Sequence, residues 1–391
     1  MINFLIRKLI KNHEDVKDPK VRDSYGKMAG IVGIISNGVL CAMKIFIGLI
    51  SGSIAIVADA INNLADASSS LITLVGFKLA SMPEDEEHPY GHARIEYLTG
   101  IAVSVMIIIV GLELAKSSFD KILNPTPLEF SWIVVAVLIL SIIIKIWQAL
   151  FNITAGKKIN SLTLMATGAD SRNDVISTSV VLVGVLVGHF FDLQIDGYLG
   201  MAVALFILWS GIGLVKETIS PLLGEAPDRE LVEQIEKVAH EFDGVIGIHD
   251  LVVHNYGPGK IFASAHIEVD SQVDVMISHD LIDNIEKKII NDFNILMTVH
   301  MDPVDLQDPN REPLSLLLED AICKIPGALG FHDLRIVPGS THTNVIFDVV
   351  LSTECKEPEE ALRKALTAKI SEFNPSFCSV IEFDRSYVKT N

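Results

Sequence analysis

The first 220 residues of this chain contain six apolar runs, each long enough to cross a lipid bilayer as a helix. A spanning helix needs about 20 mostly apolar residues. Backbone groups in lipid have to be satisfied within a helix or a closed barrel, so such runs leave few other folds open. The predicted spans are Met28–Ile50, Ile54–Ala80, Tyr97–Ser118, Trp132–Ile153, Leu162–Phe190 and Tyr198–Leu214. We therefore expect a six-helix transmembrane domain over residues 28–222, after an N-terminal segment of residues 1–27.

The distribution of charge predicts how the helices are oriented. The N-terminal segment is basic, and Lys157 and Lys158 form a second basic link between predicted spans. Basic loops stay on the cytoplasmic side, so both termini are expected there, in an integral protein of a bacterial cytoplasmic membrane. The net charge of −18 argues against nucleic-acid binding, which usually requires a basic surface.

The pattern changes after the last span, where two small α+β modules are predicted. Residues 228–305 follow the order helix, strand, strand, helix, strand, and residues 313–388 repeat it. The segment Gly244–Leu251 matches Gly327–Leu334 at five of eight positions, 83 residues apart. A repeat at a fixed spacing indicates one unit used twice, and each copy is expected to be a ferredoxin-like αββαβ module.

Metal-ligating residues interrupt two of the apolar runs. Asn62 and Asp66 lie in the second predicted span, and Asp170 and Asp174 lie in the fifth, each pair four residues apart. Residues at this spacing project from one face of a helix. A carboxylate in hydrocarbon is costly and is by default a functional group facing the protein interior.

The ligand atoms of this group are all oxygens, which suit hard cations such as Mn²⁺. Zinc sites more often include histidine or cysteine. We therefore expect one divalent cation between the two helices. The alternative is a set of polar helix contacts, with the aspartates paired to Arg172 or Asn173.

A second group of potential ligands lies between the second and third spans. Asp85, His88 and His92 fall within eight residues of one another, in the block His88-Pro-Tyr-Gly-His92 that leads to Glu96. Three ligand types this close together could share one ion, whereas a lone loop histidine is usually just solvated. We place a second, weaker metal site here.

From about Met28 to Asp305 the chain resembles the cation diffusion facilitator family. The resemblance rests on Asp59 with Asp66, the HPYGHxxxE block and the DxxxD of the fifth span. It also rests on the His-Asp-Leu, Ala-His-Ile-Glu, Ser-His-Asp-Leu and Val-His-Met-Asp-Pro segments of the first module. It implies six transmembrane helices, a metallochaperone-like cytoplasmic domain and a homodimer. It also implies export of a divalent metal against protons, so the metal is substrate and no prosthetic group or enzymatic activity is expected.

The resemblance also implies roles for individual residues. The family's transport site falls on Asn62, Asp66, Asp170 and Asp174, and the absence of histidine there resembles manganese-type members. Mn²⁺ is thus favoured over Zn²⁺, Fe²⁺ and Co²⁺. Its loop site falls on Asp85, His88 and His92, and Arg94 with Asp228 matches a structural ion pair. The implied cytoplasmic-domain ligands are His249, His266, His279, His300 and Asp302.

The second module departs from the family pattern, because His332 matches His249 but other ligand positions differ. Asp348, Glu382 and Asp384 stand where His266, His300 and Asp302 stand in the first copy. This favours a packing or dimer-extending role for the second copy. Weak binding of a harder ion is the alternative.

The same ligand residues are compatible with other functions. A zinc or iron(II) exporter of the same family, a cation channel and a membrane-anchored metal sensor would all use similar ligands. The chain lacks a GxxxxGK[ST] phosphate loop and an HExxH motif, which argues against an ATP-driven pump and a zinc protease.

Overall fold

The computed structural model describes residues 2–16, 18–51, 54–124, 130–191, 196–352 and 354–385. The chain divides into two compact units. The helical unit comprises Met1–Glu225 and Asn255–Lys260, and the sheet unit comprises Ala226–His254 and Ile261–Asn391.

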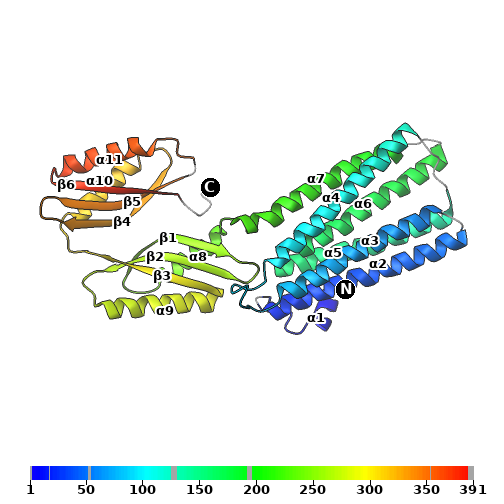
Figure 1. Ribbon diagram of the computed structural model, residues 1–391, viewed down its shortest axis with the longest axis horizontal. Helices are drawn as coiled ribbons and strands as arrows, with labels where there is room; N and C mark the ends of the chain where they lie inside the picture. The colour runs from blue at the N-terminus through cyan, green and yellow to red at the C-terminus, as the bar shows by residue number, and fades with distance from the viewer. Residues whose placement is uncertain are drawn as a thin grey trace. The chain divides into compact units, whose positions relative to one another are not determined.

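Long helices dominate the helical unit. They are α1 (Ile2–Leu9), α2 (Pro19–Ser51), α3 (Ile54–Ala80), α4 (Ile95–Leu123), α5 (Trp132–Ile159), α6 (Leu162–Phe191) and α7 (Asp196–Leu223). Helices α2 to α7 lie side by side in Figure 1, and α2 packs on α3, α4 on α7, and α5 on α6. Large apolar side chains point outward from this bundle, including Phe46 and Trp209, which are 67% and 74% exposed. Such a surface is suited to lipid rather than water.

Within the described residues, five helices are long and apolar enough to cross a membrane, namely α2, α4, α5, α6 and α7. Helix α3, the second predicted span, is not one of the five. Its middle is rich in polar residues, with Asn62, Asn63 and Asp66 followed by a run of three serines that ends at Ser70. An apolar membrane domain is therefore confirmed for five of the six predicted helices.

Helix boundaries differ from the sequence prediction mainly at polar ends. Helix α2 begins at Pro19, not at Met28, and proline is favoured in the first turn of a helix. The added turns are amphipathic, since Val21 and Tyr25 are buried against Ile6 of α1. A hydropathy window misses such turns, because their outer face is charged.

A buried ion pair joins α2 to α4 at one end of the bundle. The Arg22 Nη2 atom lies 3.2 Å from Glu96 Oε2, and the two side chains are only 12% and 5% exposed. Arg22 also donates to the Ile159 carbonyl of α5, and Thr163 of α6 donates to the Glu96 carbonyl over 2.5 Å. Four helices therefore meet at this pair.

Arg22→Met is expected to lower the free energy of unfolding by about 3–5 kcal/mol, because the buried Glu96 carboxylate would lose its cation. Thermal unfolding of the purified protein in detergent measures this loss. The pair of Lys27 with Asp23, at 2.5 Å and with a lysine side chain that is 45% exposed, provides the control, since Lys27→Met should cost no more than about 0.5 kcal/mol. Equal melting temperatures for the two variants would contradict a stabilising role for Arg22.

The sheet unit contains two modules with the predicted element order. The first module has α8 (Arg229–His240), β1 (Val245–Asn255), β2 (Ile261–Asp270), α9 (Val275–Phe293) and β3 (Ile295–Val304). The second has α10 (Arg311–Ile322), β4 (Ala328–Pro338), β5 (Thr343–Leu351), α11 (Glu359–Phe373) and β6 (Phe377–Arg385). Residues 386–388, the end of the predicted second module, lie outside the described residues.

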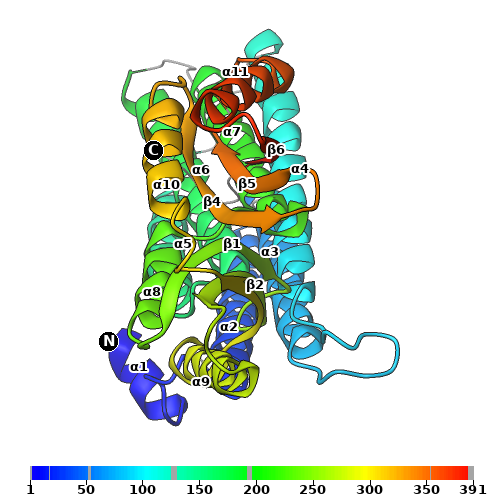
Figure 2. The same ribbon diagram turned by 90° about the vertical axis from the view of Figure 1, so that its left-hand side faces the viewer.

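Each module forms a three-stranded sheet, in the orders β1-β2-β3 and β4-β5-β6. Strands β2 and β3 pair in parallel, as do β5 and β6. The two cores are separate, one around Ile235 and Ile285 and the other around Leu318 and Phe347. Figures 1 and 2 show the two sheets next to each other, with α9 and α11 on their outer sides.

The two modules correspond residue by residue. Asp250 in β1 and Asp333 in β4 occupy the same position of the repeat, and both have left-handed backbone conformations, with φ of 50° and 54°. His266 faces His300 across β2 and β3, as Asp348 faces Glu382 across β5 and β6. The carboxylates of the second module therefore lie at the same places in its sheet as the histidines in the sheet of the first module.

Candidate metal sites

Helices α3 and α6 bring together three of the four residues predicted to form a transport site. Ligand oxygens of Asp66, Asp170 and Asp174 all lie within 4.8 Å of one another. Asn62 lies on α3, one turn before Asp66, but its side chain falls outside the described part of the structure. The packing of the two helices is fixed nearby, since the hydroxyl oxygens of Thr73 and Thr167 are 3.1 Å apart.

Arg172, one of the two residues expected as alternative partners of the aspartates, contacts other groups in the described residues. Its guanidinium donates to Ser210 Oγ over 3.2 Å and lies 5.9 Å from the ring centre of Phe206. Arg172 is thereby directed toward α7 and not toward the aspartates.

Lys145 of α5 also belongs to this group, although it is not among the residues predicted from the sequence. Its Nζ atom lies 2.6 Å from Asp66 Oδ2 and 2.6 Å from Asp174 Oδ2, and the side chain is 5% exposed. A single ammonium thus bridges carboxylates of α3 and α6. Lysine and a divalent metal are both cations, so a metal that bound here would compete with Lys145 for the same oxygens.

A sequence signal for Lys145 did exist. It stands alone in the middle of an apolar run, twelve residues before the basic link at Lys157 and Lys158. An ionisable residue inside a membrane span is by default functional. Lys44 in α2 shows the same signal and is also buried, at 2% exposed.

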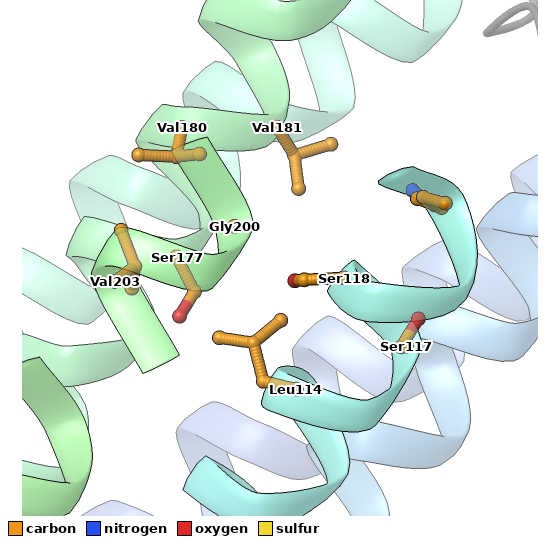
Figure 3. Close-up of a pocket in the computed structure, with 9 residues that line it drawn as sticks. Leu114, Ser117, Ser118, Ser177, Val180, Val181, Gly200 and Val203 are labelled. Atoms are coloured by element: carbon orange, nitrogen blue, oxygen red, sulfur yellow. The ribbon is translucent and has the colours of Figure 1, made fainter. Parts of the chain in front are cut away.

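A small pocket of about 50 Å³ lies between α4, α6 and α7. Figure 3 shows hydroxyls of Ser118 and Ser177 among apolar side chains such as Leu114 and Val180. Ser177 follows Asp174 by three residues on α6. The pocket has room for one or two water molecules. Its lining consists of serine hydroxyls, apolar groups and Lys121, with no carboxylate, histidine or cysteine to bind a metal.

The predicted loop site is brought together between α3 and α4. Asp85, His88 and His92 offer ligand atoms within 4.8 Å of one another. His88 Nδ1 lies 3.3 Å and His92 Nε2 3.5 Å from the Asp85 carboxylate. The backbone N–H of His88 donates to Asp85 and is the largest of the influences that lower the pKa of this carboxyl below its ordinary value. A carboxylate that stays ionised is available as a ligand.

Four of the five predicted cytoplasmic-domain ligands also cluster. His249, His266 and Asp302 form a group within 4.8 Å, and His300 Nε2 lies 3.3 Å from Asp302 Oδ1. His279 is different, because it is exposed near the start of α9 and belongs to none of the ligand groups in the described residues. Its sequence position resembles a family ligand, but the fold of this chain does not bring it to the others.

The electrostatics of this cluster follow from its mixed charges. Burial of the His249 ring lowers its pKa, but the carboxylates of Asp250 and Asp302 outweigh burial and raise it to about 9. Burial alone would raise the pKa of Asp302, whereas the neighbouring histidines hold it below its ordinary value. The His249 imidazolium and the ionised carboxylates thus stabilise one another, and a metal that binds His249 would have to displace its proton.

The predicted pair of Arg94 with Asp228 stays a prediction, since these residues belong to different units. Within the helical unit, Arg94 donates to the Asn255 carbonyl over 2.9 Å and lies 4.3 Å from the ring centre of Tyr256. Gly257 follows with a φ of +118°, and a Cβ there would come within 2.5 Å of Ala93. The turn after β1 therefore packs tightly on the start of α4.

Comparison with known proteins identifies two known domains in this chain. The cation efflux transmembrane domain matches residues 30–223, and the cytoplasmic domain of cation efflux proteins matches residues 227–304. The second αββαβ module lies beyond the matched residues.

Three relatives align with most of their length. An uncharacterized transporter of Methanocaldococcus jannaschii is 36% identical over 276 residues, which cover 70% of this chain and 97% of the relative. The manganese efflux system protein MneS of Bacillus subtilis is 27% identical over 285 residues, covering 72% and 96%. The cation-efflux pump FieF of Salmonella newport is 26% identical over 288 residues, covering 72% and 95%.

These similarities confirm the resemblance drawn from the sequence motifs. The matched domains contain the aspartates of α3 and α6 and the histidine cluster of the first module. The chain belongs to the cation efflux (cation diffusion facilitator) family of integral membrane proteins, whose members transport divalent metal ions and are not enzymes.

Proposed function

We propose that this protein exports Mn²⁺ from the cytosol through a site formed by Asn62, Asp66, Asp170 and Asp174. The convergence of three carboxylates from α3 and α6 inside an apolar bundle is the observation that supports it most strongly. An all-oxygen set suits Mn²⁺ better than Zn²⁺. A relative with the name of a manganese efflux protein supports the same metal.

Export is coupled to protons in this proposal. Carboxylates bind a metal only after losing their protons, so a metal arriving from the cytosol replaces protons and displaces the Lys145 ammonium from Asp66 and Asp174. Rocking of the helices around the site then exposes it to the other side. Protons arriving there compete for the same oxygens and release the metal.

The proposal includes the arrangement in the membrane. All of α2 to α7 span it, α3 with its polar face toward the site, and both termini lie in the cytosol of a bacterial cell. The loop site of Asp85, His88 and His92 captures metal ions near the entrance. Two copies form a homodimer through the cytoplasmic domain, which is the domain that the second family match describes.

Metal flux into proteoliposomes tests the proposed substrate. The wild type is expected to move Mn²⁺ in preference to Zn²⁺, and Asn62→His is expected to raise the Zn²⁺ rate relative to Mn²⁺ by about tenfold, because imidazole suits zinc. Asn124→His, at the exposed end of α4, is the matched control. A wild type that prefers Zn²⁺ would contradict the manganese assignment and leave a zinc exporter of the same family.

The same vesicles separate an antiporter from a channel. An imposed pH gradient is expected to drive metal uphill, and its collapse is expected to stop net uptake. Flux that ignores the pH gradient and only follows the metal gradient would indicate a channel. A protein that binds metal without any flux would be a sensor.

A further inference from the structure

We propose that the second αββαβ module completes a divalent-metal site with the first module of the same chain. The ligands are Asp250 of β1 together with His332, Asp348 and Asp384 of β4, β5 and β6. This goes beyond the transport function, because the site lies wholly within the sheet unit and three of its four ligands come from the second module. The role differs from the packing role that the sequence favoured.

The four side chains lie close enough to share one ion. Carboxylate oxygens of Asp250, Asp348 and Asp384 are within 4.8 Å of one another. His332 Nε2 lies 3.4 Å from Asp250 Oδ1 and 3.8 Å from Asp384 Oδ2. A metal with bonds of about 2.1 Å holds its ligand atoms roughly 3–4 Å apart, so only small movements would close the site around an ion.

Buried polar atoms at the site lack hydrogen bonds. Both ring nitrogens of His332 are buried and make no hydrogen bond within the described residues. The His332 side chain is only 12% exposed, and its ring stacks on that of His249 with centres 4.3 Å apart. Buried nitrogens of this kind are normally satisfied, and a metal ion is a suitable partner for them.

The carboxylates of the site are also short of cations. Within the described part of the chain, Asp250 and Asp384 pair only with histidines, and Asp348 makes no ion pair. Asp333, the counterpart of Asp250 in the repeat, is neutralised by Arg335 at 2.6 Å. The first copy has Val252 at the position of that arginine, so Asp250 stays available for a metal.

Space for the ion and its water ligands is present between the modules. A cavity of about 370 Å³ is lined by His249, Asp250, His332 and Asp384, among other residues. One imidazole and three carboxylates form a mixed nitrogen and oxygen set, which fits first-row divalent ions such as Mn²⁺, Fe²⁺ or Zn²⁺. An ion bound here would tie the two modules of one chain together.

Mn²⁺ binding to the full-length protein in detergent tests the site, with the loss of the free-ion electron paramagnetic resonance signal as the readout. Asp174→Asn in every sample removes the transport site, so the result does not depend on the proposed transport function. Adding Asp348→Asn and Asp384→Asn is expected to weaken one bound Mn²⁺ per chain at least about 100-fold. Glu360→Gln, at an exposed carboxylate on α11 away from the ligands, is the matched control and should keep that ion.

An unchanged number and affinity of bound ions in the double variant would overturn the proposal, as would an equal loss in the Glu360→Gln control. If the double variant fails to fold, Asp250→Asn provides the test, because asparagine tolerates the left-handed backbone at this position. The expected result is a smaller rise in melting temperature on adding Mn²⁺ than in the background protein. An equal rise would show that Asp250 is not a ligand.

Discussion

Asp174→Asn is expected to abolish metal efflux while the helical unit stays folded. The substitution keeps the shape of the side chain but removes a charge that lies within 4.8 Å of Asp66 and Asp170. A site that loses a charged ligand binds its metal at least about 100-fold more weakly. Initial rates of Mn²⁺ uptake into inside-out vesicles measure the loss, and size-exclusion chromatography measures folding.

Asp120→Asn is the matched control for this substitution, since Asp120 is an exposed aspartate on α4. It is expected to transport at the wild-type rate. Efflux by Asp174→Asn at more than about a tenth of the wild-type rate would show that Asp174 is not a ligand of the transport site. It would also contradict the proposal that α6 contributes to that site through this residue.

Lys145→Met is expected to tighten metal binding at the membrane site by at least about tenfold and to slow turnover. The Lys145 ammonium contacts Asp66 and Asp174 at 2.6 Å each, so a metal has to displace it. Two opposite charges about 4 Å apart interact by about 4 kcal/mol at the effective dielectric constant near a protein surface, and a tenfold change uses only a third of that. Equilibrium binding and transport rates, measured on the same preparation, separate the two effects.

Two further variants show whether the charge or the length of Lys145 matters. Lys145→Arg keeps a cation and should stay close to wild type in metal affinity. Lys157→Met removes an exposed lysine from the same helix and should change neither quantity. If Lys145→Met binds metal with wild-type affinity, the lysine does not compete with the metal and is only a packing contact of α5.

Competition between Lys145 and the metal would affect the metal-free state of the proposed transport cycle. An empty site with three carboxylates would be costly to hold inside an apolar bundle. In the proposed cycle Lys145 would supply a positive charge when the metal is gone, which would lower the free-energy cost of the empty state. Lys145→Met should therefore slow the return step more than the metal-loaded step, which single-turnover and steady-state rates can distinguish.

Much of the fold could be predicted from the sequence, because it depends on local patterns. Apolar runs of about 20 residues predict spanning helices from length alone, and five of the six predicted runs meet this criterion in the structure. The early start of α2 at Pro19 was missed because its polar, amphipathic turns gain stability from packing on α1. Such packing is not visible to a hydropathy count.

The candidate sites were predicted to different degrees. Asp85, His88 and His92 are close in sequence, and the loop has only to turn once to bring them together. His279 was predicted by resemblance and lies apart on an exposed face of α9. Lys145 was missed because its partners are 79 and 29 residues away in the chain, and no local pattern connects them.

The sequence by itself determined the class of protein, the two ligand-bearing helices and the repeated module, since each depends on residue type and short spacing. Only the tertiary structure decided which charges meet. It placed Lys145 between Asp66 and Asp174, and it brought Asp250 of one module to Asp348 and Asp384 of the next. These contacts arise from packing between distant segments, where burial strengthens each charge–charge interaction and no sequence period records the neighbour.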